Sequence, residues 1–143
     1  EEGFVFFTNY ESEKGRSMLH NPKVGITFFW PVLERQIIIK GNAEKISSAR
    51  SDDYFNSRPR GSQLGALVSP QSSVIPNRQF LQDRLAALMD KYQNKPIPRP
   101  DHWGGIVVKP VQIEFWQGRP NRLHDRISCQ LINKVWKSER LAP

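Results

Sequence analysis

Apolar and polar residues alternate along several short stretches in the first third of the chain, and this alternation predicts β-strands. Val24, Ile26 and Phe28, for example, would share one face of a single strand. The third stretch contains Gly41-Asn42, where we expect a bulge or a bend. The pattern predicts strands over residues 3–9, 23–30 and 33–46.

Helical spacing replaces this alternation in the middle of the chain. Ser12 is the expected N-cap of a short helix that ends at residue 20, and Ser47 or Ser48 caps a second helix over 47–56. Asn77 begins the longest helix, which runs to about residue 92. The apolar stripe of that helix is Phe80, Leu81, Leu85, Leu88 and Met89. We further expect a short helix at 61–68, a polar loop at 69–76 and a rigid, proline-rich connector at 94–100.

Alternation returns in the C-terminal part, where two or three strands are expected between residues 104 and 140. Lys109-Pro110 interrupts the alternation, and residues 118–121 have the composition of a turn. Cys129 lies in an expected strand at 127–132, where a small buried thiol is a better interpretation than a nucleophile. With a single cysteine, the chain cannot form an internal disulfide bond.

A hairpin around the turn at 118–121 would bring four functional side chains together: Trp116, Arg122, His124 and Arg126. Arginine forks suit phosphate and carboxylate oxygens, and an indole face can stack on a flat ring. This combination predicts a site for a planar, anionic ligand. The alternative is a solvated hairpin with a tryptophan in the core, and the hairpin residues alone leave both interpretations open.

The order of the elements, with strands first, helices in the middle and strands last, indicates the α+β class. We expect a single domain over residues 1–143, mainly β and built on an antiparallel sheet or barrel. The chain opens inside an apolar strand, without a methionine. We therefore expect that native sequence precedes this N-terminal segment.

Composition and motifs exclude several classes of function. The formal net charge is +7, but the basic residues are scattered singly and form no patterned stripe, so nucleic-acid binding is not expected. No apolar run is long enough for a transmembrane helix. The glycine-rich loops of Rossmann and P-loop proteins are absent. The histidines, His20, His102 and His124, lie far apart in the sequence, so no metal site is expected.

Taken together, motifs along the whole chain closely resemble those of the pyridoxine/pyridoxamine 5'-phosphate oxidase family. Each motif is moderately specific alone, whereas their joint occurrence in this order is very specific. The motifs that carry the resemblance are residues 6–9 with Lys14, 34–36, 54–59 with 62–63, 71–73, 103–105, 115–118, 122–126 and 139–143.

The resemblance implies a split β-barrel flanked by helices, and a homodimer that holds FMN in clefts between its two subunits. It implies oxidation of pyridoxamine or pyridoxine 5'-phosphate to pyridoxal 5'-phosphate. Dioxygen would accept the electrons and yield hydrogen peroxide. A cytoplasmic location is the default expectation, or an organelle if a targeting segment precedes the chain.

The resemblance also implies roles for individual residues. Arg122 and His124 are the expected catalytic residues, which orient the substrate and stabilise developing charge, and whether His124 also moves a proton stays open. The expected substrate contacts are Tyr54, Arg58 and Ser62 at the phosphate, with Arg122 and His124 over the pyridine ring. The expected FMN contacts are Phe7, Thr8, Lys14, Gln36, Gln71, Ser72, Trp116 and Arg126.

Two departures from the family pattern oppose FMN binding. Glu13 stands where the family usually has an arginine, and an anion near a phosphate weakens its binding unless the side chain points away. The strand that precedes residue 1 in the family, with its own arginine and lysine, is absent. The main alternative is therefore a non-catalytic protein that binds pyridoxal phosphate or a flavin on the same fold. A related split-barrel flavoprotein with another substrate is a third possibility, which the run from Arg122 to Arg126 disfavours.

Overall fold

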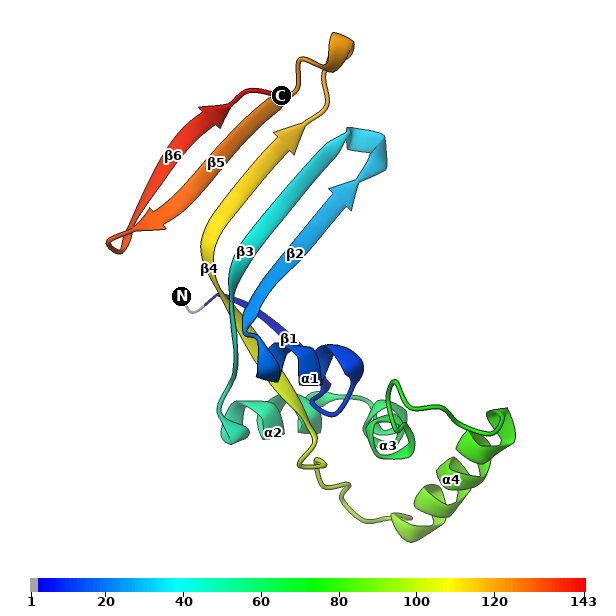
Figure 1. The fold of residues 1–143 in the computed structure, drawn as a ribbon. Helices are drawn as coiled ribbons and strands as arrows, with labels where there is room; N and C mark the ends of the chain where they lie inside the picture. Colours follow the sequence, from blue (N-terminus) through cyan, green and yellow to red (C-terminus); the bar gives the residue numbers. More distant parts are fainter. Residues whose placement is uncertain (1–2) are drawn as a thin grey trace. The chain divides into compact units, whose positions relative to one another are not determined.

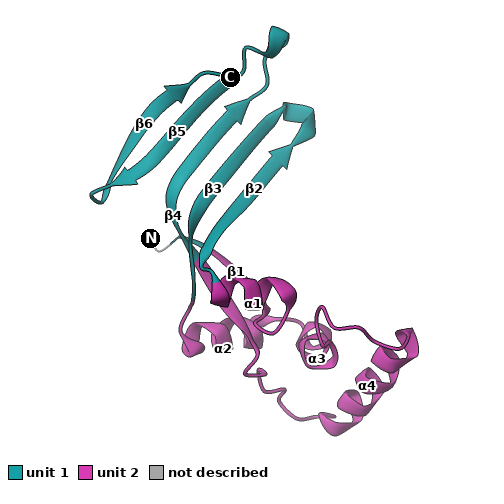
Figure 2. Cartoon of the chain, in the orientation of Figure 1, with its two compact units in different colours: residues 1–4, 21–44, 108–143 teal, residues 5–20, 45–107 magenta. Residues whose placement is uncertain are grey.

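The computed structural model describes residues 3–143, and their contacts divide the chain into two compact units. Unit 1 comprises residues 1–4, 21–44 and 108–143, and unit 2 comprises residues 5–20 and 45–107. Figure 2 shows that unit 2 contains all of the labelled helices, whereas unit 1 is built from strands.

Within the described residues, six strands form one hydrogen-bonded sheet in the order β2-β3-β4-β5-β6, and β1 pairs with β4 (Figure 1). The pairings of β2 with β3, β4 with β5 and β5 with β6 are all antiparallel. The strands are β1 (Phe4–Asn9), β2 (Lys23–Trp30), β3 (Arg35–Lys45), β4 (Trp103–Gln117), β5 (Asp125–Ile132) and β6 (Val135–Leu141). The expected antiparallel sheet is confirmed.

The helices begin where the sequence supplies caps. In α1 (Glu13–His20), the Ser12 hydroxyl accepts the Gly15 N–H, and in α2 (Ser48–Ser57) the Ser47 hydroxyl accepts the Arg50 N–H. In α4 (Arg78–Lys91), the Asn77 side chain accepts the Phe80 N–H. These three caps confirm the predicted helix starts. The third helix, α3 (Arg60–Val68), follows Pro59 directly and lacks a side-chain cap.

The sequence predicts a bulge or a bend at Gly41-Asn42, and the strand pairing excludes the bulge. The register between β2 and β3 is regular through Gly41↔Val24 and Asn42↔Lys23, so there is no bulge at Gly41. The glycine is needed for another reason, because a Cβ atom there would lie 2.4 Å from the carbonyl oxygen of Lys109. β4 runs through Lys109-Pro110, where the alternation of apolar and polar residues is interrupted. β5 pairs only with residues 112–117 of β4, so the missing N–H of Pro110 costs no hydrogen bond to β5.

The core of unit 2 forms around four buried side chains, Phe55, Leu64, Ile97 and Trp103. Of the apolar stripe predicted for α4, Leu88 packs against this core, whereas Leu85 and Met89 are exposed. In unit 1, Ile39 and Val108 are buried, but many large apolar side chains on the strands remain exposed. Cys129 is half-buried, less than the sequence predicted. Unit 1 thus leaves an apolar sheet surface uncovered.

Candidate functional site

In unit 2, the junction between α2 and α3 positions the residues predicted to bind the substrate phosphate. Pro59 disfavours helical backbone at the preceding residue, so Arg58 is extended (φ −75°, ψ 148°) and ends α2. The same proline begins α3, whose first turn carries Ser62. Arg58 and Ser62 therefore come from two helices that meet at one proline, which fixes their spacing.

A cavity of about 260 Å³ lies at this junction and is lined by three of the predicted site residues, Arg58, Ser62 and Gln71. The Nη1 atom of Arg58 is buried and has no hydrogen-bond partner among the described residues. The Gln71 Oε1 atom accepts the backbone N–H of Asn9 at 3.4 Å, which leaves the side-chain NH₂ group of Gln71 available to donate. A buried cationic donor without a partner, beside a hydroxyl and an amide, fits an anionic ligand with several oxygens.

An aromatic stack holds the Arg58 guanidinium in place. The rings of Phe7 and Tyr54 stack with centroids 3.6 Å apart, and the Phe7 ring lies 5.7 Å from that of Trp103. The Arg58 guanidinium carbon lies 4.6 Å from the Trp103 ring centroid, within the range of a cation–π interaction. Phe7 and Tyr54, both predicted site residues, thus belong to one layer with the tryptophan beneath Arg58.

The other predicted residues of unit 2 do not line this cavity. Thr8 is buried, and its hydroxyl donates to the Asn9 carbonyl at 3.5 Å. Lys14 lies exposed in the first turn of α1, directly after the exposed Glu13. Ser72 is exposed in the loop before α4, with a positive φ of 67°. Lys14 and Ser72 are therefore accessible to a ligand, whereas Thr8 is buried.

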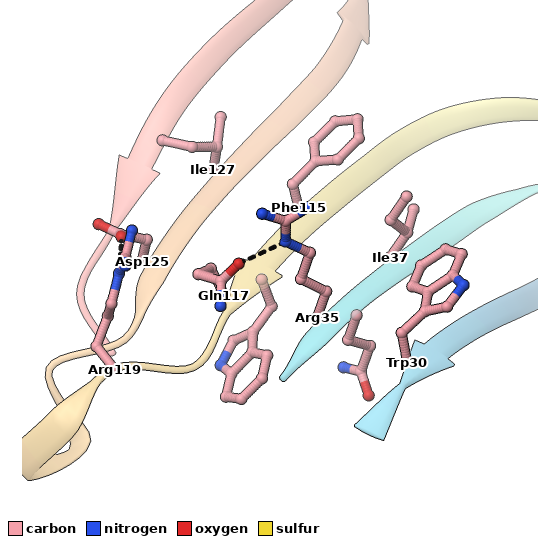
Figure 3. Close-up of a pocket in the computed structure, with 10 residues that line it drawn as sticks. Trp30, Arg35, Ile37, Phe115, Gln117, Arg119, Asp125 and Ile127 are labelled. Carbon is pink, nitrogen blue, oxygen red and sulfur yellow. Dashed lines mark hydrogen bonds and ion pairs between the residues drawn. The ribbon is translucent and has the colours of Figure 1, made fainter. Parts of the chain in front are cut away.

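Unit 1 has a separate cavity of about 410 Å³, which Figure 3 shows over the ends of β2, β3 and β4. Gln36 and Trp116, both predicted to contact FMN, line it. Figure 3 also shows the Arg35 Nε atom donating to the Gln117 side chain, at 2.7 Å. Flat apolar walls with an amide at the edge suit a planar heterocycle such as a flavin ring.

Arg126, another predicted FMN contact, already has protein partners. Its Nε atom lies 2.7 Å from Glu114 Oε1, and its Nη1 atom donates to the Ala142 carbonyl at 3.0 Å. The hydrogen bond with Glu114 raises the pKa of Arg126 above its ordinary value. Because the Glu114 carboxylate balances its charge, Arg126 is better suited to orient a polar ring edge than to neutralise a phosphate.

The turn between β4 and β5 contains the two expected catalytic residues. A short 3₁₀ helix, η2 (Pro120–Arg122), has Asn121 and Arg122 in the left-handed region, with φ of 57° and 62°. The Arg122 guanidinium is exposed and forms no ion pair with a described residue. The His124 ring lies 4.8 Å from the Trp116 ring, and Trp116 pairs with Arg126 across the strands. Of the four side chains predicted to lie close together, the structure brings together Trp116, His124 and Arg126. No ring contact or ion pair among the described residues joins the fourth, Arg122, to them.

The sequence-based reasoning missed the residues that hold this turn. Asp125 Oδ2 accepts the Arg119 Nε–H at 2.7 Å, and Asp125 Oδ1 accepts an N–H of Arg140, also at 2.7 Å. These two hydrogen bonds, the one from Arg119 first, lower the pKa of Asp125 below its ordinary value of 3.8. Strand pairing was the available signal, since the register that places Ile127 opposite Arg140 brings Arg140 beside Asp125.

Comparisons with known proteins identify the family of the chain. A family model described as pyridoxamine 5'-phosphate oxidase matches residues 1–91. A second, described as the pyridoxine 5'-phosphate oxidase C-terminal dimerisation region, matches residues 103–143. The chain belongs to the pyridoxine/pyridoxamine 5'-phosphate oxidase family. Membership in this family supports the expected enzyme class and FMN as the cofactor, and the dimerisation region supports a homodimer.

Curated relatives carry the same name. The pyridoxine/pyridoxamine 5'-phosphate oxidases of Christiangramia forsetii and Flavobacterium johnsoniae are 58% and 57% identical to this chain. The enzyme of Synechocystis sp. is 55% identical. Each alignment covers 99% or more of this chain but only 66–67% of the relative, so the chain spans about two thirds of the length of these proteins.

Solved structures confirm the expected fold class. PhzG from Burkholderia lata 383, solved with tetrahydrophenazine-1-carboxylic acid, matches with a TM-score of 0.91 at 27% identity, over 99% of this chain and 69% of that one. An FMN-binding, pyridoxamine 5'-phosphate oxidase-related protein from Nostoc punctiforme matches with a TM-score of 0.72 at 18% identity, over 97% and 71%. The chain therefore has the FMN-binding split-barrel fold. Among residues 3–143, no helix is long and apolar enough to cross a membrane, and no group of ligands could hold a metal ion.

Proposed function

We propose that this chain oxidises pyridoxamine or pyridoxine 5'-phosphate to pyridoxal 5'-phosphate, with FMN as cofactor and dioxygen as electron acceptor. The observation that carries the proposal is that Arg58, whose buried Nη1 atom has no hydrogen-bond partner among the described residues, lines a cavity together with Ser62 and Gln71. Family membership gives that cavity a ligand of suitable chemistry, a phosphorylated pyridine.

In this proposal the α2–α3 junction binds the substrate phosphate. Arg58 supplies charge-assisted hydrogen bonds from its guanidinium, and the Ser62 hydroxyl, which has no partner among the described residues, supplies another. The Tyr54 hydroxyl is exposed and adds a third donor. The stack of Phe7 on Tyr54 fixes the tyrosine ring, so little side-chain freedom is lost when the substrate binds.

The proposed FMN contacts are Phe7, Thr8, Lys14, Gln36, Gln71, Ser72, Trp116 and Arg126. When bound, FMN supplies the hydride acceptor for the oxidation. Lys14 offers a point charge for the cofactor phosphate, and Gln36 offers both a donor and an acceptor for the edge of the ring. Glu13 is exposed in the first turn of α1, where a carboxylate stabilises the helix N-terminus. Glu13 thus has a structural role at the start of the helix and does not need to face the cofactor.

Arg122 and His124 orient the pyridine ring of the substrate in this proposal. The His124 Nδ1 atom accepts the Arg119 backbone N–H at 3.1 Å, so the neutral ring carries its proton on Nε2. That N–H can donate to a substrate oxygen or to charge that develops near the reacting carbon. The exposed Arg122 guanidinium adds a positive charge on the same turn.

The wider setting is also part of the proposal. The partner is a second copy of the chain, with FMN at the subunit interface, and the apolar side chains left exposed on the sheet of unit 1 support such an interface. The small-molecule partners are the B6 phosphate ester and dioxygen. We propose a cytoplasmic enzyme that binds neither nucleic acid nor membrane.

An FMN titration followed by an oxygen-dependent assay with pyridoxamine 5'-phosphate tests the proposal. We expect FMN-dependent release of pyridoxal 5'-phosphate and hydrogen peroxide, and loss of both products in the Arg122→Ala/His124→Ala double variant. Binding of pyridoxal 5'-phosphate without turnover in excess FMN would instead indicate the non-catalytic binding protein, which Glu13 favours. A chain that showed no binding of pyridoxal 5'-phosphate and no turnover would overturn both the oxidase and the non-catalytic binding protein for the chain as it stands.

A further inference from the structure

The turn between β4 and β5 has an unfavourable backbone that must be held by other contacts. Asn121 and Arg122 are consecutive residues in the left-handed region, a conformation that L-residues with a Cβ atom rarely adopt. Two backbone hydrogen bonds hold the turn: the Leu123 N–H donates to the Pro120 carbonyl at 3.3 Å, and the Gly118 N–H donates to the Glu34 carbonyl at 2.7 Å. Side-chain contacts therefore also hold this segment, which carries both proposed catalytic residues.

Arg119 holds the turn from two sides. Its backbone N–H donates to His124 Nδ1 at 3.1 Å, and its guanidinium Nε donates to Asp125 Oδ2 at 2.7 Å. The other Asp125 oxygen accepts an N–H of Arg140 on β6, also at 2.7 Å. Arg119, His124, Asp125 and Arg140 thus form a continuous chain of contacts from the imidazole to the last strand.

These contacts do little for overall stability. The side chains of Arg119 and Arg140 are 56% and 66% exposed, and that of Asp125 is 39% exposed. Exposed ion pairs contribute little to folding because water and salt screen them. A modest local energy is nevertheless enough to select one tautomer and one orientation of a neighbouring imidazole, because those states lie close in energy.

We propose that Asp125 is a positioning residue for His124. It anchors Arg119, whose backbone N–H then occupies the Nδ1 lone pair and keeps the neutral imidazole in the tautomer protonated at Nε2. Arg140 in turn fixes the Asp125 carboxylate. The importance of this tautomer for the reaction rests on the proposed function, whereas the positioning itself does not.

Nitrogen-15 NMR of the imidazole side chains tests the positioning directly at a pH where histidines are neutral, near 8. The chain has three histidines, so His20 and His102 serve as internal references and a His124→Gln variant assigns the remaining signals. We expect the Nε2–H tautomer of His124 to exceed the other by at least about tenfold in the native chain. In Asp125→Ala we expect this ratio to fall at least about threefold, while the two references stay unchanged.

Glu139→Gln is the matched control, because it removes one carboxylate from β6 beside Arg140 and makes none of these contacts. It should leave the tautomer ratio unchanged. Arg140→Gln should lower the ratio less than Asp125→Ala does, because Arg119 retains its carboxylate partner. An unchanged ratio in Asp125→Ala, an equal shift in Glu139→Gln, or a native His124 protonated at Nδ1 would each overturn the inference. Circular dichroism and urea unfolding verify that each variant is folded.

Kinetics separate this inference from the proposed function. We expect Asp125→Ala to lower kcat about three- to tenfold with little change in KM, because the misplaced proton affects the reacting state more than substrate binding. If Asp125→Ala shifts the tautomer ratio of His124 but the native chain shows no turnover, the positioning is supported and the proposed function is overturned. Turnover by the native chain without a tautomer shift in the variant would overturn the positioning alone.

Discussion

Arg58 shows at the scale of one residue how a buried polar group prepares a protein to bind a ligand. A buried donor without a partner typically costs about 1–3 kcal/mol, more when the group is charged. Here the cost is partly offset by the Trp103 ring, 4.6 Å from the guanidinium carbon. A ligand that supplies the missing acceptor recovers this free energy on binding, and Arg58 is one of the residues that line the cavity.

Replacing Arg58 with alanine should therefore weaken phosphate binding specifically. Loss of hydrogen bonds from a charged group, each worth about 1.5–3 kcal/mol, predicts a KM for pyridoxamine 5'-phosphate that rises roughly 10- to 100-fold. Steady-state kinetics and calorimetric titration with inorganic phosphate measure this change. Arg60→Ala is the control, because the Arg60 guanidinium donates hydrogen bonds to the carbonyls of Tyr92 and Lys95 and Arg60 does not line the cavity. Equal losses in the two variants would refute the assignment.

Asp125 should make a small part of the stability depend on pH, in one direction only. Its hydrogen bonds with Arg119 and then Arg140 lower its pKa in the folded state. The stabilisation is therefore fully present above the unfolded-state pKa of about 4 and is lost as the pH falls through the folded value. Urea unfolding should give a free-energy difference between the native chain and Asp125→Asn that is constant from pH 8 to 5 and shrinks below about pH 4. A difference that is the same at pH 3 and pH 7 would contradict the pairing.

Residue identities predicted from the sequence were most useful where a motif was long. The run from Arg122 to Arg126 placed His124 near Trp116, and the rings lie 4.8 Å apart. The same run gave no role for Asp125, because its partners Arg119 and Arg140 come from outside the motif. Contacts of that kind depend on strand register, which a local pattern does not specify.

At the scale of elements, local sequence signals located the helix starts well, but they did not give the reason for a glycine inside a strand. Ser12, Ser47 and Asn77 all cap the helices that the sequence assigned to them. At Gly41, in contrast, the sequence predicts a bulge or a bend, whereas its lack of a side chain serves the close approach of β3 to Lys109. A capping signal is local, whereas the reason for a glycine in a strand lies on a neighbouring strand.

Gly41→Ala should consequently destabilise the sheet of unit 1. The added Cβ atom would lie 2.4 Å from the Lys109 carbonyl oxygen and 2.9 Å from its carbonyl carbon. Both are backbone atoms that cannot rotate away, so we expect a loss of about 1–3 kcal/mol in the free energy of unfolding. In the matched control Gly61→Ala, on α3, the Cβ atom meets nothing within 4 Å, and the variant should gain about 0.5–1 kcal/mol. Denaturant unfolding measures both, and comparable losses in the two variants would exclude the steric explanation.

At the scale of the whole molecule, the antiparallel sheet and its fold class could be predicted, whereas the uncovered apolar surface of unit 1 could not. Alternation identifies which residues of a strand share a face, but not whether that face meets the same chain or another one. Trp136 and Val135, for example, remain 44% and 60% exposed on β6. Both lie in the segment that matches the C-terminal dimerisation region. The proposed interface with a second copy of the chain would account for their exposure.

Disruption of this surface should therefore separate the subunits. We expect the native chain to sediment as a dimer and Trp136→Glu to dissociate, because a charged carboxylate would have to be desolvated in the interface. Sedimentation velocity over a range of protein concentrations measures the shift, and FMN fluorescence shows whether cofactor affinity falls with it. Val74→Glu is the control, since Val74 is an equally apolar, fully exposed side chain outside residues 103–143 and should leave the dimer intact. If Trp136→Glu stayed dimeric and kept FMN while Val74→Glu dissociated, the subunits would meet through the helical unit instead of the C-terminal strands.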